Sequence, residues 1–436
     1  MGRYGLSHLG VDRSQSLLIQ WHGRGRLCES GEVSERLHVV PDPAPDRPAA
    51  ATLAPHYSRF RVSERLLLTG HSHQAWPDVA REGVLEAFDD AALAVGLKWD
   101  RATARADRVR AGVRTLLDDP GATIALGANT HELLVRFLSA LDLQARPRIV
   151  TTDAEFHSAR RQLDRLGERY VELVTVPSQP VATLSERLAA EVDDATATVV
   201  VSSVLFETAQ IVPGLSVVAD ACARTGTELL VDVYHQLGVV PLSVADAALD
   251  DAWVMGGGYK YLQLGEGNCF LRLPPHAEGA RPVVTGWYAE SGDLEPAAVG
   301  TVAYPRGADR FAGATYDPTS HYRASRVLDF WASQGLTAPV LRTISLHQRA
   351  VLARAFDDLD LPEALVTRDR DTPAEGFAGF LALHSPRAAE LQAALASQGV
   401  STDARGDHLR FGPAPYLTDE QLLAAVQGLE DCVVQE

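Results

Sequence analysis

Apolar residues recur every three or four positions in two segments near residue 100. The segments are 78–95 (DVAREGVLEAFDDAALAV) and 105–118 (RADRVRAGVRTLLD), and the second carries its arginines on the polar side. This spacing places the apolar residues on one face of an α-helix. We therefore predict two amphipathic helices before residue 120.

Beyond Pro120, short apolar runs alternate with segments of helical periodicity. The runs are rich in Val, Ile and Leu, as in buried strands, and the segments between them are long enough to form helices. Strands joined by helices form βαβ units, which build a mainly parallel, doubly wound sheet. The predicted strands are 122–126, 148–152, 170–176, 196–204, 228–233, 252–257 and 268–273, and the predicted helices are 130–141, 158–167, 182–192 and 215–226.

The two ends of the chain differ from this central pattern. Residues 1–55 include a stretch rich in Pro and Ala (VVPDPAPDRPAAATLAP), so we expect a disordered or loosely attached extension there. After a helix predicted at 320–335, shorter mixed elements indicate a smaller α+β domain. We expect the segment 56–100 to contribute to that small domain, with a large domain at 101–325 and the small domain at 326–436.

Composition narrows the possible classes of protein. The 436 residues carry 57 acidic and 40 basic side chains, a net charge of −17, which argues against binding to nucleic acid or an anionic membrane. The chain has neither a signal-peptide pattern nor a run of 18 apolar residues, so we expect a cytoplasmic protein. Cys28, Cys222, Cys269 and Cys432 show no C-x-x-C spacing, which predicts reduced thiols.

The loops after the strands of a parallel sheet usually carry its ligand-binding groups. Residues 127–130 (GANT) follow the first predicted strand and lead into a helix. Small residues and free N–H groups there favour a phosphate, although a plain helix cap by Thr130 would have the same sequence. Phe156 and His157 follow the second strand, where an aromatic ring either lies against a flat ligand or belongs to the core.

Asp232 ends a further strand, and His235 follows it. A carboxylate in this place either begins a turn or pairs with a cation in the site. His235 either orients that cation or is an interior histidine.

Lys260 is one of only two lysines, with Lys98, in a chain that has 38 arginines. Because arginine is not deprotonated in proteins, it cannot serve as an amine nucleophile, and a retained lysine indicates amine chemistry. A surface or anion-binding lysine is the alternative. GGGYK is not a nucleotide-binding loop, because a strand follows it, and we expect glycines 256–258 to clear space for a cofactor.

These groups together match the needs of pyridoxal phosphate (PLP). PLP requires an amine for a Schiff base, a carboxylate for its pyridinium nitrogen, an aromatic face and a phosphate cradle. On these residues the chain resembles the class V aminotransferase superfamily of fold-type I PLP enzymes, and within it kynureninase. The superfamily's Asp-x-x-His stands as Asp232 and His235, and the Tyr-Lys pair of kynureninases as Tyr259 and Lys260.

The resemblance implies a fold, an assembly and residue roles. The fold is α/β, with a mainly parallel seven-stranded sheet in the large domain plus a smaller α+β domain, and the assembly is a homodimer with active sites at the subunit interface. Lys260 would form the Schiff base, Asp232 would bind the pyridine nitrogen beside His235, and Tyr259 would reach the phosphate and relay protons. The other implied cofactor-binding residues are Asn129, Thr130, His131, Phe156, Trp287 (in GWYAE) and Thr315 (in FAGATYDP).

The expected substrate-binding residues follow the kynureninase pattern at Arg410 and differ from it near residue 71. Arg410, in LRFGPAPYLT, matches the arginine that clamps the substrate carboxylate, for which a planar guanidinium is suited; an edge-strand surface arginine is the alternative. Where kynureninases read Gly-Asn-Ser-Leu-Gly, this chain has TGHSHQAWP. We interpret His71, Ser72 and His73 as donors facing a small amino-acid substrate, with solvent-exposed histidines as the alternative. Two histidines on a loop are weak evidence for a metal, and none is expected.

The expected reaction is a kynureninase-like hydrolytic cleavage of a side-chain carbon–carbon bond. The alternatives are a related β-lyase, cyclase or aminotransferase of a specialised pathway and, outside the enzymes, a non-catalytic binding protein of the same fold. A cysteine desulfurase is disfavoured, because it needs a nucleophilic cysteine on a mobile loop near the substrate.

Overall fold

A computed structural model describes residues 48–290 and 294–434. Most of the extension predicted at 1–55, and Cys28 within it, lies outside the described residues. Its last residues belong to the body of the protein. Helix α1 (Ala50–Leu53) leads into the 3₁₀ helix η1 (Ala54–Phe60), and Leu53, Ala54 and Tyr57 are all buried.

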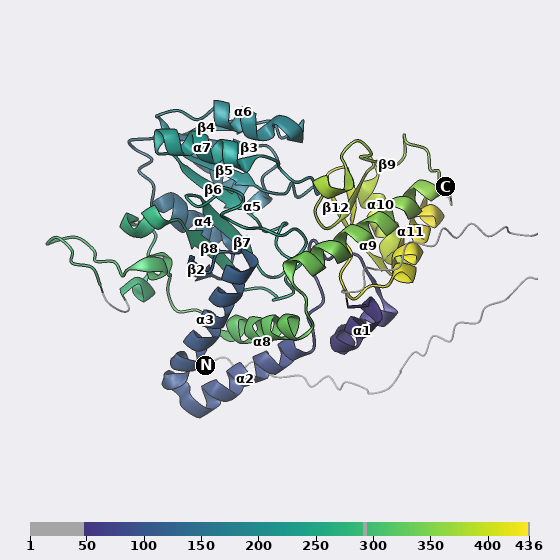
Figure 1. The fold of residues 1–436 in the computed structure, drawn as a ribbon, viewed down its shortest axis with the longest axis horizontal. Helices are drawn as coiled ribbons and strands as arrows, with labels where there is room; N and C mark the ends of the chain where they lie inside the picture. The colour runs from purple at the N-terminus through teal and green to yellow at the C-terminus, as the bar shows by residue number, and fades with distance from the viewer. Residues whose placement is uncertain (1–47, 291–293, 435–436) are drawn as a thin grey trace, which may run out of the picture. The chain divides into compact units, whose positions relative to one another are not determined.

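A mixed seven-stranded sheet forms the centre of the large lobe (Figure 1). Its order is β2-β8-β7-β6-β5-β3-β4, and β8 runs antiparallel to both of its neighbours while the other pairs are parallel. The predicted mainly parallel seven-stranded sheet is therefore confirmed. The strands are β2 (Thr123–Gly127), β3 (Arg148–Thr152), β4 (Glu172–Val176), β5 (Thr196–Ser202), β6 (Glu228–Asp232), β7 (Trp253–Gly257) and β8 (Cys269–Leu273).

Alternate residues of the buried strands pack on opposite faces of the sheet. In β5, Val199 and Val201 join a core cluster with α3, α6 and α7, whereas Val200 joins a second cluster with α4 and α5. Helices cover β5 on both sides and every residue of the strand is buried, and the hydroxyl groups of its polar residues Thr196, Thr198 and Ser202 donate hydrogen bonds within the protein. The helices are α3 (Trp99–Leu116), α4 (Thr130–Ser139), α5 (His157–Gly167), α6 (Leu184–Ala190) and α7 (Leu215–Thr225).

Two further helices pack closely against each other beside the large lobe. These are α2 (Val79–Ala94) and α8 (Thr319–Ser333), and both α2 and α3 contact α8. A Cβ atom added at Gly83 would lie 2.6 Å from the backbone oxygen of Tyr322, so this glycine permits the close approach.

The small lobe is an antiparallel sheet of order β12-β13-β10-β9, accompanied by helices α9, α10 and α11 (Figure 1). A short parallel pair of β1 and β11 ties the chain near residue 66 to this lobe. The 21-residue helix α9 was not predicted from the sequence, although Pro339 stands in its first turn, where proline is favoured. The elements are β1 (Leu66–Leu67), β9 (Thr367–Arg368), β10 (Leu381–His384), β11 (Val400–Ser401), β12 (Asp403–Arg405), β13 (His408–Phe411), α9 (Ala338–Asp358), α10 (Ala388–Ser397) and α11 (Asp419–Val434).

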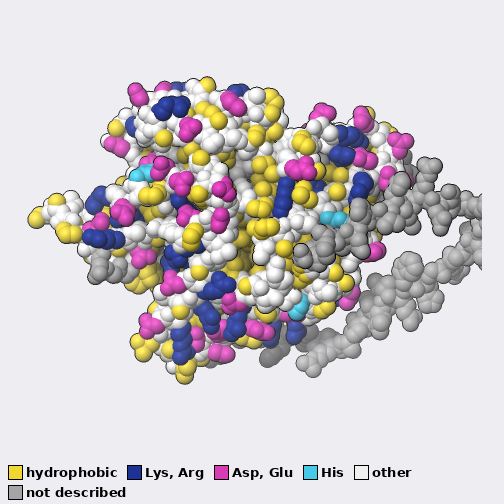
Figure 2. Space-filling model, viewed as in Figure 1, with side chains coloured by type: hydrophobic (Ala, Val, Ile, Leu, Met, Phe, Trp, Pro, Cys, Tyr) yellow, Lys and Arg dark blue, Asp and Glu magenta, His cyan; other side chains and the backbone are white. Residues whose placement is uncertain are grey.

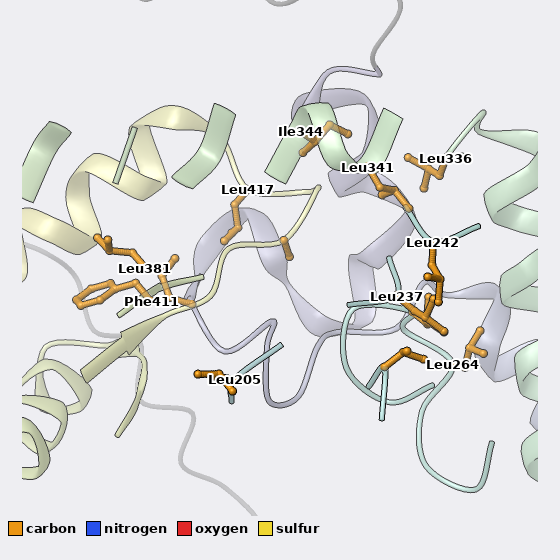
Figure 3. Packing of buried hydrophobic residues seen from close by; sticks show 14 of the residues in the cluster. Leu205, Leu237, Leu242, Leu264, Leu336, Leu341, Ile344, Leu381, Phe411 and Leu417 are labelled. Atoms are coloured by element: carbon orange, nitrogen blue, oxygen red, sulfur yellow. The ribbon is translucent and has the colours of Figure 1, made fainter. Parts of the chain in front are cut away.

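The lobes share one apolar core. Figure 3 shows part of it: Leu237 and Leu264 of the large lobe belong to the same cluster as Leu341 of α9 and Phe411 of β13. On the face in Figure 2, acidic and basic side chains are interspersed. Within the described residues, no helix is both long and apolar enough to cross a membrane.

Candidate active site

A cavity of about 490 Å³ opens at the carboxyl ends of the central strands. Its walls come from the loops after β2, β3, β5, β6 and β7 and from the start of β8. Eight of the predicted site residues meet there, from segments up to 131 positions apart in sequence. The lining residues are Ala128, Asn129, Thr130, His131, Phe156, Ser158, Ser202, Val204, Asp232, Tyr234, His235, Tyr259, Lys260, Glu266, Gly267 and Cys269.

Lys260 follows β7 and is only 5% exposed. Its Nζ lies 2.9 Å from His235 Nε2 and sits 4.5 and 5.0 Å from the ring centroids of Tyr234 and Phe156. Burial lowers the pKa of Lys260 to about 7, while nearby Asp232 acts in the opposite direction. A large fraction of this amine is therefore neutral at pH 7 and able to attack an electrophile.

Asp232 is the last residue of β6, on the strand next to the one that leads to Lys260. Its Oδ1 accepts a hydrogen bond of 2.8 Å from the backbone N–H of Tyr234, which fixes the carboxylate at the cavity wall. Enclosure by the protein raises the pKa of Asp232, and the bond from Tyr234 and the charge of Lys260 partly oppose this. Both shifts show that the site disfavours charges without a partner, so a cationic ligand group beside Asp232 would be held strongly.

The start of α4 also lines the cavity. The predicted cap by Thr130 is wrong. The cap is Asn129, whose Oδ1 accepts a hydrogen bond of 2.9 Å from Glu132 N–H, because Asn129 has the extended backbone that an N-cap residue adopts. Thr130 and His131, in the first turn of the helix, line the cavity, and a helix N-terminus offers N–H donors to a phosphate; the N–H of Thr130 bonds the thiol of Cys269 here.

Glycines 256–258 do not clear space for a cofactor, contrary to the prediction. A Cβ atom at Gly256 would meet the Phe270 ring at 2.9 Å, and one at Gly257 would meet the Tyr234 ring at 2.5 Å. At Gly258 it would meet Leu264 at 2.7 Å. The glycines make room for side chains of the protein, and one of these, Tyr234, is a wall of the cavity.

The loop at residues 71–74 lies beside the cavity without lining it. The ring of His73 stacks on that of Tyr259 at 5.1 Å, and the backbone of His71 hydrogen-bonds the ring of His235. Ser72 Oγ is 3.1 Å from His73 Nδ1. The two histidine rings have different surroundings, and no group of three or more possible metal ligands occurs in the described part of the chain.

Arg410 is on β13 of the small lobe and is 3% exposed, so the alternative of a surface arginine is excluded. Its guanidinium donates to Asp403 Oδ2 at 2.6 Å and to the carbonyl oxygen of Phe206. The ring of Phe206 packs edge-on against that of Phe156, 5.5 Å away, and this links Arg410 to the cavity wall. Arg410 is thus one side chain removed from the cavity.

Trp287 and Thr315 are the predicted cofactor-binding residues that the structure places elsewhere. They contact each other, with Trp287 Nε1 donating to Thr315 Oγ1 at 3.0 Å, but neither lines the cavity. Trp287 is 54% exposed and stacks on Tyr288. Within one chain this pair does not join the other site residues.

Glu155 and Ser202 were missed in the sequence. Glu155 is 2% exposed and accepts hydrogen bonds from Thr152 Oγ1 (2.8 Å), Ser202 N–H (3.0 Å) and Ser202 Oγ (2.6 Å). Burial raises the pKa of Glu155 to about 7, with nearby Asp232 acting in the same direction and the hydrogen bonds from Ser202 and Thr152 acting against both. Ser202 ends β5 directly opposite Asp232 of β6. Its place at the end of an apolar run was the available signal, whereas nothing local distinguishes Glu155.

Cys269 also lines the cavity, from β8. Burial raises the pKa of its thiol to about 12, which opposes formation of a nucleophilic thiolate. Cys222 and Cys432 are buried free thiols as well. No cysteine of the described residues combines a mobile loop with the site.

Comparisons with known proteins agree with this architecture. No protein-family model matches the sequence. A curated relative, the uncharacterized aminotransferase YcbU of Bacillus subtilis, is 23% identical over 343 residues, which cover 78% of this chain and 88% of the relative.

Solved structures show the fold. A mutant of C-DES with glycine covalently linked to its PLP cofactor superposes with a TM-score of 0.75 at 18% identity, covering 87% of this chain and 98% of the other. The complex of the cystine C-S lyase C-DES with cysteine persulfide gives 0.73 at 19% identity, over 85% and 98%. The cysteine desulfurase CsdA of Escherichia coli gives 0.70 at 16% identity, over 88% and 98%. The chain therefore has the α/β fold of fold-type I PLP-dependent transferases.

Proposed function

We propose that this chain, folded as a fold-type I transferase, is a PLP-dependent enzyme that acts on a small amino acid. The observation that carries the proposal is the arrangement around Lys260: a buried amine whose pKa is lowered, with Asp232 on the adjacent strand and the Phe156 ring 5.0 Å from Nζ. The cavity volume lies within the range of roughly 300–1,000 Å³ that is usual for small-molecule sites.

The donor set fits PLP group by group. The neutral amine of Lys260 suits its aldehyde, and Asp232 suits a protonated ring nitrogen. The Phe156 ring offers a flat face, and the N–H groups of Thr130 and His131 suit the phosphate. When bound, PLP supplies an electron sink for bonds at the α-carbon of an amino acid.

The residues of this chain would then perform defined tasks. Lys260 Nζ takes and returns the proton of the substrate α-carbon, since its lowered pKa allows it to act as a base at pH 7. His235 holds Nζ through the 2.9 Å contact and remains a neutral imidazole, because burial lowers its pKa. Asp232 keeps the ring nitrogen protonated. The ring of Tyr259, which stacks on His73, would form the part of the cavity wall next to the loop at residues 71–74.

The proposed active unit is a cytoplasmic homodimer with active sites at the subunit interface. Support comes from Trp287 and Thr315, which resemble cofactor-binding residues yet stand outside the cavity of their own chain. The exposed apolar side chains Phe88, Leu93 and Leu97 near α2, which are 72–78% exposed, offer a surface for a second copy.

The proposed reaction is cleavage of a substrate side chain, in the manner of kynureninase. A second candidate is a β-lyase, because the cystine C-S lyase C-DES shares the fold over 85% of this chain. A persulfide-forming desulfurase is less suited, since the thiol of Cys269 is enclosed in a strand and its pKa is raised.

A substrate screen tests the reaction. The PLP-loaded protein is incubated with kynurenine, 3-hydroxykynurenine, cystine and the common amino acids, and products are identified by mass spectrometry. Formation of an anthranilate and alanine would support the kynureninase-like reaction. Pyruvate and a persulfide from cystine would support the lyase instead, and turnover of neither class would contradict both.

A further inference from the structure

Asp403 already holds the guanidinium group of Arg410, the residue that the resemblance to kynureninase assigns to the substrate carboxylate. The two residues stand opposite each other on β12 and β13, and Asp403 Oδ2 accepts from Arg410 Nη2 at 2.6 Å. Both side chains are buried, at 9% and 4% exposure. A charge-assisted hydrogen bond in such surroundings is strong, so an incoming carboxylate has to compete with it.

Asp403 has a second cation within reach. Its other oxygen, Oδ1, lies 2.9 Å from Nη1 of Arg405, whose side chain is 42% exposed. A buried carboxylate that loses its sole partner is costly, but one that keeps a second arginine remains paired. Arg405 therefore allows Asp403 to release Arg410 at a moderate cost.

The surroundings of Arg410 contain unsatisfied polar atoms. Within the described residues, Arg410 Nε and both ring nitrogens of His71 have no hydrogen-bond partner. His71 is fully buried, and its Nε2 lies 3.8 Å from Asp403 Oδ2, which is beyond hydrogen-bond distance. Buried donors without acceptors are rare and unfavourable. A carboxylate ligand would supply acceptors to Arg410 Nε and to the N–H of His71.

Two series of contacts connect Arg410 and His71 to the site at Lys260. On one side the ring of His235 donates to the backbone carbonyl of His71 and contacts Lys260 Nζ. On the other side Arg410 donates to the carbonyl of Phe206, whose ring packs on Phe156 beside the cavity. The charge of Arg410 also helps to lower the pKa of Lys260, so the two groups are close enough to interact, and we expect a carboxylate held by Arg410 to belong to a ligand bound at Lys260.

We propose that Asp403 is an internal competitor that sets which ligands Arg410 accepts. The substrate carboxylate displaces Asp403 from Arg410, Asp403 stays with Arg405, and His71 becomes a second donor to the bound carboxylate. A neutral amide lacks the charge needed to displace Asp403, so the exchange selects for free α-carboxylates. This inference rests on the proposed function, because it assumes that an amino acid binds at Lys260.

The test compares an acid with its amide in the PLP-loaded protein. L-Alanine and L-alaninamide are titrated while the cofactor absorbance at about 400–430 nm is followed. Asp403→Asn keeps the shape and an acceptor for Arg410 but removes the competing charge. We expect it to lower the Kd of L-alanine about tenfold, the size of one charge-assisted bond, and to leave that of L-alaninamide unchanged within twofold.

Arg405→Gln provides the opposite change, because it removes the second cation that pairs with Asp403. Asp403 then depends on Arg410 alone, so we expect the Kd of L-alanine to rise severalfold with no change for the amide. Equal affinities for L-alanine in the wild type and both variants would overturn the inference. The cofactor absorbance of the three proteins would still support the binding of PLP, so the proposed function would stand. The inference would also be overturned if L-alanine caused no change in the cofactor absorbance of Asp403→Asn. Absence of cofactor absorbance in every protein would overturn the proposed function, and the inference with it.

Discussion

At the level of single residues, two buried groups of the site have pKa values near neutrality for the same reason. Burial lowers the pKa of Lys260 and raises that of Glu155, each to about 7. The two differ in what satisfies them. Lys260 contacts a single histidine nitrogen, whereas Glu155 accepts three hydrogen bonds that tie the loop of Phe156 to the end of β5. Glu155 is therefore expected to position Phe156 and to make stability depend on pH.

The sign of that dependence follows from the raised pKa. Between about pH 4.5 and 7 the folded protein binds the Glu155 proton more than the unfolded chain does, so this contribution is complete below pH 4.5 and is lost as pH rises through 7. In the wild type, ionisation of Glu155 should lower the free energy of unfolding by roughly 1–3 kcal/mol across that range. Glu155→Gln stays neutral, so the variant should not show this decrease. Urea unfolding of the PLP-free protein at several pH values measures the difference between variant and wild type.

Glu168→Gln is the matched control, since Glu168 forms an exposed ion pair with Arg165. It should leave the pH profile as in the wild type. If Glu155→Gln gave a profile parallel to the wild type, the pKa of Glu155 would be the same in the folded and unfolded protein, and its role would be structural alone.

The sequence was enough to predict which residues carry the chemistry of the site, but not which residues those side chains contact. Lys260, Asp232 and Phe156 could be found because each residue type follows a strand, and strand ends of a parallel sheet meet. The pairing of Arg410 with Asp403 could not, because it depends on the register of a short hairpin that the sequence analysis did not identify. Glu155 stands in a loop, and its partner Ser202 is 47 positions away.

At the level of elements, β7 shows how a strand shapes the site without touching a ligand. Gly257 is buried and faces the Tyr234 ring, which supports Lys260 Nζ from 4.5 Å. Gly257→Ala should displace that ring, because its Cβ would stand 2.5 Å from ring atoms. We expect a loss of about 1–3 kcal/mol in stability and a weaker affinity for PLP, measured by urea unfolding and absorbance titration.

Gly279→Ala serves as the control, since a Cβ atom there meets nothing within 4 Å. Both properties should stay at their wild-type values. A Gly257→Ala protein with unchanged stability and PLP affinity would show that the Tyr234 ring is free to move, and would contradict this account of β7.

The order of strands and helices in the large lobe was predictable because short apolar runs mark its strands and longer amphipathic segments separate them. The elements of the small lobe were harder to predict. Its strands β9, β11 and β12 have only two or three residues, too few for a period, and α9 is buried along much of its length, which blurs the contrast between its faces.

At the level of the whole molecule, the proposed dimer predicts complementation between subunits. If Trp287 serves the site of the partner subunit, Trp287→Ala should weaken PLP binding, and a Lys260→Ala chain should supply the missing tryptophan. After the two variants are mixed and refolded together at limiting PLP, borohydride labelling of the Trp287→Ala chain should rise. A partner that carries both substitutions should give no rise. Equal labelling with either partner would place Trp287 outside the partner's site.

The central claim is that Lys260 binds PLP covalently, and one measurement tests it most directly. PLP is added to the purified protein, the product is reduced with borohydride, and peptides are analysed by mass spectrometry. The account predicts absorbance at about 400–430 nm before reduction and a pyridoxyl phosphate adduct on the peptide that contains Lys260, with neither in Lys260→Ala. An unlabelled Lys260 peptide, or equal absorbance in Lys260→Ala, would contradict the claim.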